Sequence, residues 1–514
     1  MKRVIALICS AVLMLSVTAC GSKKEGVSGN QGLDTGNNKT AQTSSGTSNI
    51  DSVLSSEITG EITVYCYDPV RDKQLLEEAA KAFEEEYPGT KVNVEAFAAM
   101  PEVKTQEENG KTMKLMTQGD DSQSKNDYIN KVNTELMSGK GADVLTLDVL
   151  PFYKYAENEQ LENLQAYMDQ DPDFNRDDYR SNIFDAISDE KGQYILPIGY
   201  SFNYFAYDSS LFDDNAQAAL LAVEQLSFEQ IIELGKESFS TVNASASEPI
   251  TMFGYTDGMR QMPSMFSELF SESYSNFVNI KDKKANFTDG MFVDLLNTIK
   301  EYGEVGYLKR SVGGNSPMTP EMFEKNRQEK YFFKKKDSMS LLNEFNKNSN
   351  IRIMSGNTGD DSNDKVCGIQ TNDKRETPFS FTQAYGINTN STNKQTAWAF
   401  IKFLTSEKVQ ESTSLMGLPI NINAFLEKTK LSITGALYSP DNAGKELDES
   451  GKAIFDSYVA SIERYTSLLN TFLMKDATID NIVNTEVRNY FEGTKSAEEV
   501  AEILQNKVSL YLNE

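Results

Sequence analysis

The alternation of apolar and polar positions predicts a strand, a helix and a second strand at the start of the patterned part of the chain. Residues 61–67 are a run of β-branched and aromatic side chains, which is typical of a strand. Residues 71–87 place apolar side chains at helical spacing and end at Pro88 and Gly89. Residues 91–97 alternate valines with polar side chains. This order predicts an α/β domain with a parallel sheet.

The same periodicities continue along the chain. A helix is expected at about 127–138, and a buried strand at 142–147 that ends at Asp148. Residues 193–207 have extended character, and the chain is helical from about residue 453 to its end. Residues 100–125 are polar and irregular, so we expect an inserted loop there.

Three helix starts have recognisable capping signals. Ser227 with Gln230 and Ser496 with Glu499 have the spacing of capping boxes, in which each end of the motif satisfies a backbone N–H of the other. Thr392 precedes a further apolar helical face and is expected to cap it.

The N-terminus has the pattern of a secretory signal. Lys2 and Arg3 precede an apolar stretch, residues 4–17, that is shorter than the roughly 20 residues of a membrane-spanning helix. The tetrad that ends at Cys20 resembles the lipobox of bacterial lipoproteins. The resemblance implies removal of residues 1–19 and acylation of the Cys20 sulfur, with stable anchoring by several acyl chains. The alternative is an ordinary signal peptide with an incidental cysteine.

Residues 20–57 are rich in Gly, Ser, Thr, Asn and Gln and have no apolar periodicity. Such a segment buries too little surface to offset its ordering entropy, so it is expected to be a disordered tether that begins at the lipidated cysteine. The remaining residues, 58–514, are long enough for two domains with sizeable cores.

The chain is strongly acidic, with a formal net charge of −26. Removing residues 1–19 removes two basic residues and no acid, which leaves −28. Nucleic acid and anionic lipid are repelled by such a surface, so neither is expected as a partner. Of the four cysteines, Cys66 and Cys367 remain in the body; two buried thiols are the default, and a disulfide between them is the alternative.

The absence of histidine excludes several kinds of catalytic site. Ser-His-Asp triads, Cys-His pairs and His-containing zinc sites cannot form, and no phosphate-binding GxxxxGK[ST] loop is present. We therefore expect no cofactor and no metal. Residues 171–182 have the acidic spacing of a calcium loop, but Arg176 and Asn182 stand where Gly and Glu are required, so a capped loop is favoured. Chemistry by carboxylates alone remains open.

Five segments in this order resemble the extracellular solute-binding proteins of ABC transporters, in the family 1 carbohydrate-type group that includes maltose-binding protein. The segments are 62–89, Gly141-Ala142-Asp143-Val144, 194–212, 331–339 and 397–406. Together they extend over nearly all of the body.

The resemblance implies a periplasmic-binding-protein-like type II α/β fold, with two lobes joined by a multi-crossing hinge and a ligand cleft between them. The N-terminal lobe is expected at 58–197 and 378–430, and the C-terminal lobe at 198–377 and 431–514. The expected crossings lie near 196–200, 376–381 and 418–432. Such a protein closes around its ligand and breaks no bond.

Candidate ligand residues lie at strand ends that are expected to face the cleft. Aromatic faces pack against the C–H surfaces of sugars, and carboxylates and amides bond sugar hydroxyls. The candidates are Tyr67, Asp68, Asp148, Tyr200, Asn203, Tyr255, Asp257, Asn343, Glu344, Phe345 and Tyr385. Each candidate has a packing or capping alternative; Asp68, for example, can cap the helix after it. Trp398 is not among the candidates and is interpreted as a packing residue.

The function expected from these observations is that of the substrate-binding component of an ABC importer. It is expected to be a monomer that binds a small-molecule solute, a carbohydrate such as an oligosaccharide, and delivers it to the permease subunits. Membrane contact is expected only through lipidated Cys20, on the outer face of a Gram-positive cell membrane. Two alternatives stay open: the same fold with a peptide or polyamine ligand, which the single Trp leaves open, and a surface glycosidase that uses two carboxylates.

Overall fold

The structure is a computed structural model, and by its contacts residues Ser48–Glu514 form one unit, to which all that follows refers. The residues it describes are 50–100, 102–108, 111–117, 122–254, 261–308, 328–346, 362–372, 374–437, 440–442, 444–474 and 476–513.

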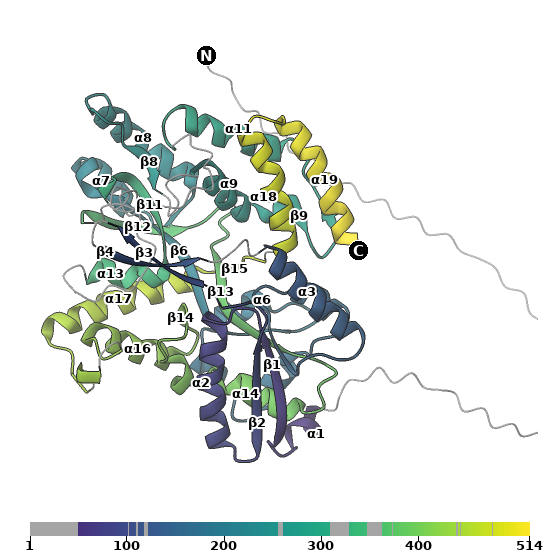
Figure 1. The fold of residues 1–514 in the computed structure, drawn as a ribbon. Helices are drawn as coiled ribbons and strands as arrows, with labels where there is room; N and C mark the ends of the chain where they lie inside the picture. The colour runs from purple at the N-terminus through teal and green to yellow at the C-terminus, as the bar shows by residue number, and fades with distance from the viewer. Residues whose placement is uncertain are drawn as a thin grey trace, which may run out of the picture. The chain divides into compact units, whose positions relative to one another are not determined.

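A mixed sheet of eleven strands forms the centre of this unit, with the main order β2-β1-β5-β13-β6-β11-β8 (Figure 1). The strands of this path are β1 (Gly60–Cys66), β2 (Thr90–Ala96), β5 (Val144–Thr146), β6 (Leu196–Asp208), β8 (Thr251–Gly254), β11 (Tyr331–Asp337) and β13 (Pro378–Ile387). The strands off this path are β7 (Gln225–Leu226), β12 (Asp364–Gln370), β14 (Leu418–Pro419) and β15 (Thr471–Phe472).

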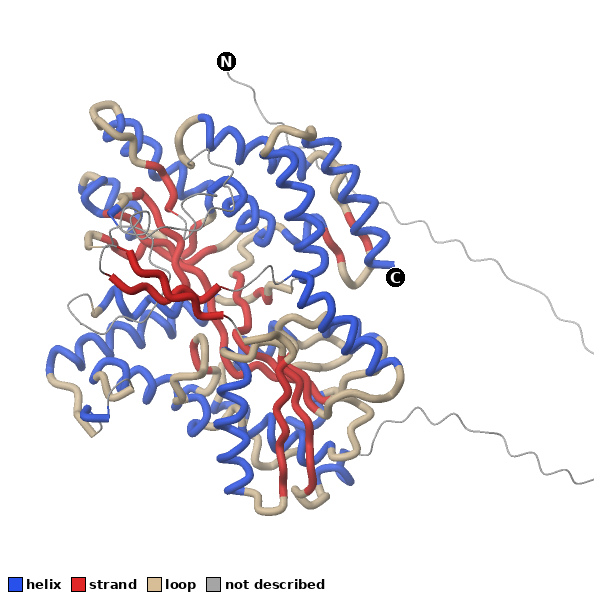
Figure 2. Tube along the Cα trace, viewed as in Figure 1, coloured by secondary structure: helices blue, strands red, loops and turns tan. Residues whose placement is uncertain are grey.

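Helices flank the strands along the sheet (Figure 2). The longer ones are α2 (Arg71–Glu86), α3 (Ser122–Met137), α7 (Asp214–Leu221), α8 (Phe228–Asn243), α9 (Gln261–Glu272), α11 (Met291–Glu304), α14 (Lys394–Phe403), α16 (Ile422–Thr434), α17 (Glu449–Leu468), α18 (Ala477–Phe491) and α19 (Ala497–Asn513). The shorter ones are α1 (Ile50–Leu54), α4 (Phe152–Glu157), α5 (Leu164–Gln170), α6 (Ser181–Ile187), α10 (Tyr274–Phe277), α13 (Leu341–Phe345) and α15 (Glu407–Gln410). Single 3-10 turns are η1 (Arg176–Asp178), η2 (Ser209–Leu211), η3 (Ser338–Ser340) and η4 (Pro440–Asn442).

The predicted strand–helix–strand opening is confirmed. β1 pairs in parallel with β2 and with β5, and α2 lies alongside β1 and β2 (Figure 1). The helix buries its predicted apolar stripe, which includes Leu75, Leu76 and Phe83. Burial of this stripe against the sheet, rather than intrinsic propensity, supplies most of the stability of such a helix.

Strand β6 connects the two halves of the sheet. Its first half pairs antiparallel with β13, and its second half pairs antiparallel with β11 and β12. Nearly all of its 13 residues are buried, because helices cover both of its faces; this explains the almost continuous apolar run in the sequence. Tyr204 and Ala206 point into one hydrophobic cluster, and Phe205 and Tyr207 into another.

The hydrophobic core consists of three clusters. The first joins β1, α2, the start of β6, α14 and the middle of α17. The second is built from the end of β6, from α8, α9, α11 and β11, and from α18 and α19. The third lies between α3, β5 and the segment after β5. Trp398 is fully buried in the first cluster, as its packing interpretation predicted.

Three local predictions are wrong. Part of the loop expected at 100–125 is an antiparallel hairpin of β3 (Glu102–Glu108) and β4 (Lys111–Thr117), and α3 begins at Ser122 rather than near residue 127. The polar composition of both hairpin strands hides their periodicity. Thr392 does not cap α14, since the residue before the helix is Asn393, whose side chain donates to the Glu61 carbonyl instead.

Other local predictions are confirmed. Ser227 and Gln230 form the capping box of α8, and Ser496 and Glu499 exchange the same pair of hydrogen bonds before α19. Cys66 and Cys367 are free and buried. A small sheet of β9 (Val278–Asn279) and β10 (Lys284–Ala285) completes the described strands. A search of the described helices found none with the length and apolar character needed to cross a bilayer.

Candidate functional site

The candidate site lies where β1 and β5 end beside the crossing strand β13. Tyr67 and Asp68 follow β1, and Asp148 follows β5, so the parallel pairing brings these residues to one edge of the sheet. β13 runs antiparallel to β5, and the Leu147 N–H donates to the Ala384 carbonyl at 2.8 Å. Of the eleven predicted ligand residues, Tyr67, Asp68, Asp148 and Tyr385 thus gather here.

Arg71 links the acidic residues of this edge. Its Nη2 donates to Asp148 Oδ2 at 2.6 Å, and its Nε donates to Asp72 Oδ1 at 3.2 Å. The Asp72 side chain is fully buried and that of Asp148 is 10% exposed, whereas the Arg71 side chain is 37% exposed. The guanidinium therefore forms the boundary between a buried acid pair and solvent.

Asp68 positions this arginine. Its Oδ1 accepts from the backbone N–H groups of Val70 and Arg71, at 2.8 and 2.9 Å. The capping interpretation of Asp68 is therefore confirmed, because these are unsatisfied donors at the start of α2.

Burial perturbs the acid pair strongly. Burial, together with the neighbouring Asp72 carboxylate, raises the pKa of Asp148 to about 7, and the Arg71 guanidinium offsets only part of this effect. Burial also raises the pKa of Asp72, against the Arg71 charge and its hydrogen bonds. The pair therefore takes up protons at a higher pH than free carboxylates do.

Several buried polar atoms around the acid pair have no hydrogen-bond partner among the described residues. They are Asp148 Oδ1, Thr146 Oγ1, Gln383 Oε1, Tyr128 OH and Tyr385 OH. Burial and then the charges of Asp72 and Asp148 raise the pKa of Tyr385, which places its hydroxyl near the acids. Since buried polar groups are nearly always hydrogen-bonded, such a cluster indicates a place for water or for the polar groups of a ligand.

A bulge in β13 directs further side chains to this edge. Phe381 pairs with Tyr200 and Gln383 with Gly199, so the residue between them, Thr382, has no partner in β6. Gln383 Nε2 reaches Asp72 Oδ1 at 3.3 Å.

Three aromatic rings lie beside the bulge. Phe381 stacks on Phe472 with ring centroids 4.3 Å apart, and Phe472 contacts Phe152 at 6.2 Å. All three side chains are half-buried. Such rings offer partly exposed apolar surface beside the bulge that carries Gln383.

A second acidic group lies on the other half of the sheet. Asp337 ends β11 opposite Asn203 in β6, and burial raises the pKa of its carboxyl. The Asp337 side chain is hydrogen-bonded to Ser201, whose hydroxyl lies 3.1 Å from that of Ser380 in β13. This polar chain connects β11, β6 and β13 just beyond the bulge.

The other predicted ligand residues are placed as follows. Tyr200 is fully buried and its hydroxyl lies 2.8 Å from Thr466 Oγ1, while Asn203 is half-buried in β6. Asn343 is half-buried in α13, and Phe345 contacts the ring of Tyr458 at 6.2 Å. Tyr255 and Asp257 lie outside the described residues.

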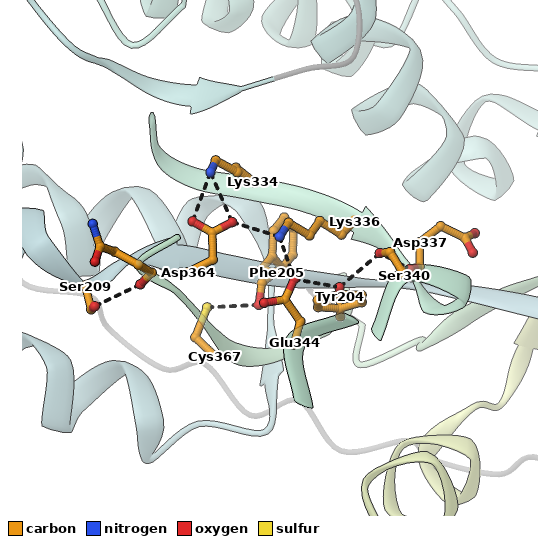
Figure 3. A network of polar contacts seen from close by, with 11 residues as sticks. Tyr204, Phe205, Ser209, Lys334, Lys336, Asp337, Ser340, Glu344, Asp364 and Cys367 are labelled. Atoms are coloured by element: carbon orange, nitrogen blue, oxygen red, sulfur yellow. Dashed lines mark hydrogen bonds and ion pairs between the residues drawn. The ribbon is translucent and has the colours of Figure 1, made fainter. Parts of the chain in front are cut away.

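Glu344 belongs to a buried ionic network on β11 and β12 (Figure 3). Lys336 Nζ lies 2.5 Å from Glu344 Oε1 and 2.7 Å from Asp364 Oδ2, and Lys334 Nζ donates to both oxygens of Asp364 at 2.9 and 3.0 Å. The Tyr204 hydroxyl adds contacts to Ser340 and Glu344. Burial lowers the pKa of Lys336, but the two carboxylates outweigh burial and raise it overall. These contacts give Glu344 a structural partner.

Arg71, Asp72, Gln383 and Phe381 are the residues of this site that the sequence interpretation missed. The position of Arg71 in the first helical turn after Asp68 is a signal that was available in the sequence. A β-bulge has no comparable signal, so Gln383 could not be identified without the register of β13.

No group of three or more acidic, Cys or His residues suited to a metal ion occurs in the described parts of the chain. In the suspected calcium loop, Asp171 instead accepts from Trp398 Nε1 and Lys402 Nζ, both at 2.7 Å. The loop is therefore held by protein contacts, as the capped-loop interpretation predicted.

Comparison with known proteins gives one family. Residues 120–430, more than half of the chain, match the family model described as bacterial extracellular solute-binding protein. No curated protein matches the sequence.

Solved structures share the fold at low sequence identity. An extracellular solute-binding protein family 1 from Alicyclobacillus acidocaldarius has 15% identity and a TM-score of 0.54, covering 89% of this chain and 100% of that chain. An ABC substrate-binding protein from Listeria monocytogenes, in complex with cycloalternan, has 16% identity and a TM-score of 0.50, with coverage of 88% and 99%. The GacH receptor of Streptomyces glaucescens, solved unliganded and with acarbose, has 15% identity and a TM-score of 0.50, with coverage of 89% and 100%.

Proposed function

This chain belongs to the bacterial extracellular solute-binding proteins, and from that premise we propose that it binds an oligosaccharide and delivers it to an ABC permease. The family and the α/β fold expected from the five segments are confirmed. Members of this family are substrate-binding proteins and not enzymes, so the glycosidase alternative is set aside. The carbohydrate, the lipid anchor and the positions of the two lobes belong to the proposal.

The observation that carries the proposal is the unpartnered Asp148 Oδ1 beside the half-exposed Arg71. A sugar offers adjacent hydroxyls that both donate and accept, so one hydroxyl can donate to Asp148 while the next accepts from Arg71. The Gln383 Oε1 atom is a second unpartnered acceptor in the same cluster. Such a site holds a neutral polyol without burying an unpaired charge.

The aromatic rings of Phe152, Phe381 and Phe472 supply the apolar half of a sugar site. Their partly exposed surfaces suit the C–H faces of pyranose rings. Two structural neighbours were solved with bound ligands, one with cycloalternan and the other with acarbose. Both ligands agree with the proposed class, and each is a ligand of the neighbour concerned.

The lobes that close on the ligand are proposed at 58–197 with 378–430, and at 198–377 with 431–514. The acid pair then belongs to one lobe and Asp337 to the other, and the crossing strands β6 and β13 connect them. Closure removes the ligand from water and gives the permease a distinct shape to recognise.

A polyamine is the second candidate ligand. Asp72 is buried and Asp148 and Asp337 are partly buried near the crossing, and Arg71 is the one cation bonded to the first two in the described structure. Excess buried carboxylate attracts an ammonium group.

A thermal-shift screen on the full mature chain separates these candidates. The panel contains malto-, cello-, xylo- and chito-oligosaccharides, with spermidine and a tripeptide as alternatives. Binding at 100 times Kd raises the free energy of unfolding by about 2.7 kcal/mol, so the melting temperature is expected to rise with at least one oligosaccharide. A rise with spermidine or the tripeptide alone would contradict carbohydrate binding.

A further inference from the structure

A cavity of about 390 Å³ lies between α16, α17 and the loop before β14. It has the size of a small-molecule site, for which about 300–1,000 Å³ is typical. Most of its wall is apolar, and it shares no lining residue with the candidate site at Asp148. The apolar lining consists of Met339, Leu342, Leu415, Met416, Leu418, Pro419, Phe425, Leu437 and Tyr458.

One positively charged side chain, that of Lys428, lines this largely apolar cavity. Lys428 Nζ donates to the carbonyl oxygens of Ser412 and Leu415, at 2.9 and 3.0 Å. An ammonium group has three donors, so one remains after these two bonds. Among the described residues no carboxylate forms an ion pair with Lys428, in contrast to Lys430 on the same helix, which lies 3.6 Å from Glu446.

Lys428 is half-buried and has no carboxylate partner among the described residues, which affects its protonation. Desolvation lowers the pKa of Lys428 to about 8. Buried charges are normally paired, and an unpaired one is costly. An anionic group placed next to Lys428 would relieve that cost.

Two of the other polar side chains of the cavity are committed to their own helix, and Thr413 and Tyr458 also line the cavity. Thr429 Oγ1 donates to the Phe425 carbonyl at 2.8 Å, and Ser432 Oγ donates to the Lys428 carbonyl at 2.8 Å. The cavity therefore combines an apolar surface with a single charged donor.

We propose that this cavity binds a small amphiphilic carboxylate, with its carboxylate on Lys428 Nζ and its hydrocarbon body against Leu342, Leu418 and Phe425. A neutral sugar does not suit the site, because the wall offers few groups for its hydroxyls. A cationic amphiphile is excluded by the charge of Lys428. This site is independent of the oligosaccharide proposal, since the two share no residue.

Calorimetric titration of the full mature chain with decanoate tests the site, with decanol as the uncharged probe. Saturable binding of one decanoate per chain is expected, at least tenfold tighter than that of decanol. Lys428→Met keeps the length of the side chain and removes its charge, so it should abolish the preference for decanoate over decanol. The matched control Lys430→Met removes a charge from the same helix outside the cavity and should leave both affinities unchanged.

A second variant tests the location without touching the charge. Met416 is 38% exposed, and Met416→Trp should narrow the cavity and weaken decanoate and decanol together. The melting temperature of each variant shows that it is folded. The proposal is overturned if decanoate does not bind saturably below its micellar concentration, if it binds no tighter than decanol, or if Lys428→Met and Lys430→Met have equal effects.

Discussion

At the scale of single residues, the site is determined by the burial of charge. Asp148 was predicted from its place at the end of a buried strand, and the structure adds the partners that give it an unusual environment. Arg71 and Asp72 come from the first turn of α2, where Asp68 fixes the backbone. The sequence gives the positions of the acidic residues, but it does not show which of their side chains are removed from solvent by folding.

Asp148→Asn tests the raised pKa. The pKa of Asp148 is about 7 in the folded chain and about 3.9 in an unfolded one. Between these values the folded state binds more protons, so the contribution of Asp148 to stability is full below about pH 4 and is lost as the pH rises through 7. Relative to Asp148→Asn, the wild type should therefore lose on the order of 1–3 kcal/mol between pH 5 and pH 8.

Urea unfolding of both proteins at several pH values measures this difference. Asp185→Asn is the matched control, since the Asp185 side chain is 71% exposed and should have little influence on the pH dependence. Parallel pH profiles for the wild type and Asp148→Asn would show that the Asp148 pKa is not raised.

At the scale of elements, the crossing strand β6 and its partners decide the geometry. Gly199 pairs with Gln383 and with Pro419, so three strands meet at one residue. A Cβ atom at this position would lie 2.5 Å from Thr382 Oγ1 and 2.7 Å from the Met416 carbonyl oxygen. The bulge therefore depends on the close approach that glycine allows.

Gly199→Ala is expected to destabilise the protein by about 1–3 kcal/mol, because the new methyl group overpacks this contact. The control is Gly451→Ala in α17, where the nearest atom to the added Cβ is 3.2 Å away and alanine favours the helix. The melting temperature should fall for Gly199→Ala and stay level or rise for Gly451→Ala. An unchanged melting temperature for Gly199→Ala would mean that the bulge tolerates a side chain.

Periodicity predicted the elements that bury one face. α2 and the parallel strands beside it follow directly from their apolar spacing, and the two capping boxes fixed the starts of α8 and α19. The hairpin of β3 and β4 was missed because its residues are mostly polar. The bulge in β13 and the placement of Phe472 depend on contacts between distant segments, which local patterns do not encode.

At the scale of the whole molecule, the chain is interpreted as an acidic binding protein tethered to a membrane by a lipid. The family is extracellular, and the lipid anchor is a proposal that rests on Cys20 and its preceding apolar stretch. Several acyl chains would hold the protein firmly. The tether expected at 20–57 is shorter than that, because the folded unit begins at Ser48 and its first helix, α1, packs against the core; the residues between Cys20 and this unit would give the protein reach.

Cys20→Ala is expected to release the protein from the membrane, because the acylated sulfur is lost while the binding body is unchanged. Detergent phase partitioning of cells that express each form measures the effect. The wild type should enter the detergent phase, and Cys20→Ala should remain in the aqueous phase or the medium. Cys66→Ala, which alters a buried thiol, is the control and should partition like the wild type.

The central claim is that the edge formed by Arg71, Asp148 and the β13 bulge holds the oligosaccharide. The direct measurement is calorimetric titration of the sugar that gives the largest thermal shift into the wild type, Asp148→Ala and Asp185→Ala. Loss of a buried charged acceptor costs about 1.5–3 kcal/mol, so Asp148→Ala should weaken binding at least tenfold, while Asp185→Ala binds like the wild type. Wild-type affinity in a folded Asp148→Ala protein would contradict the claim.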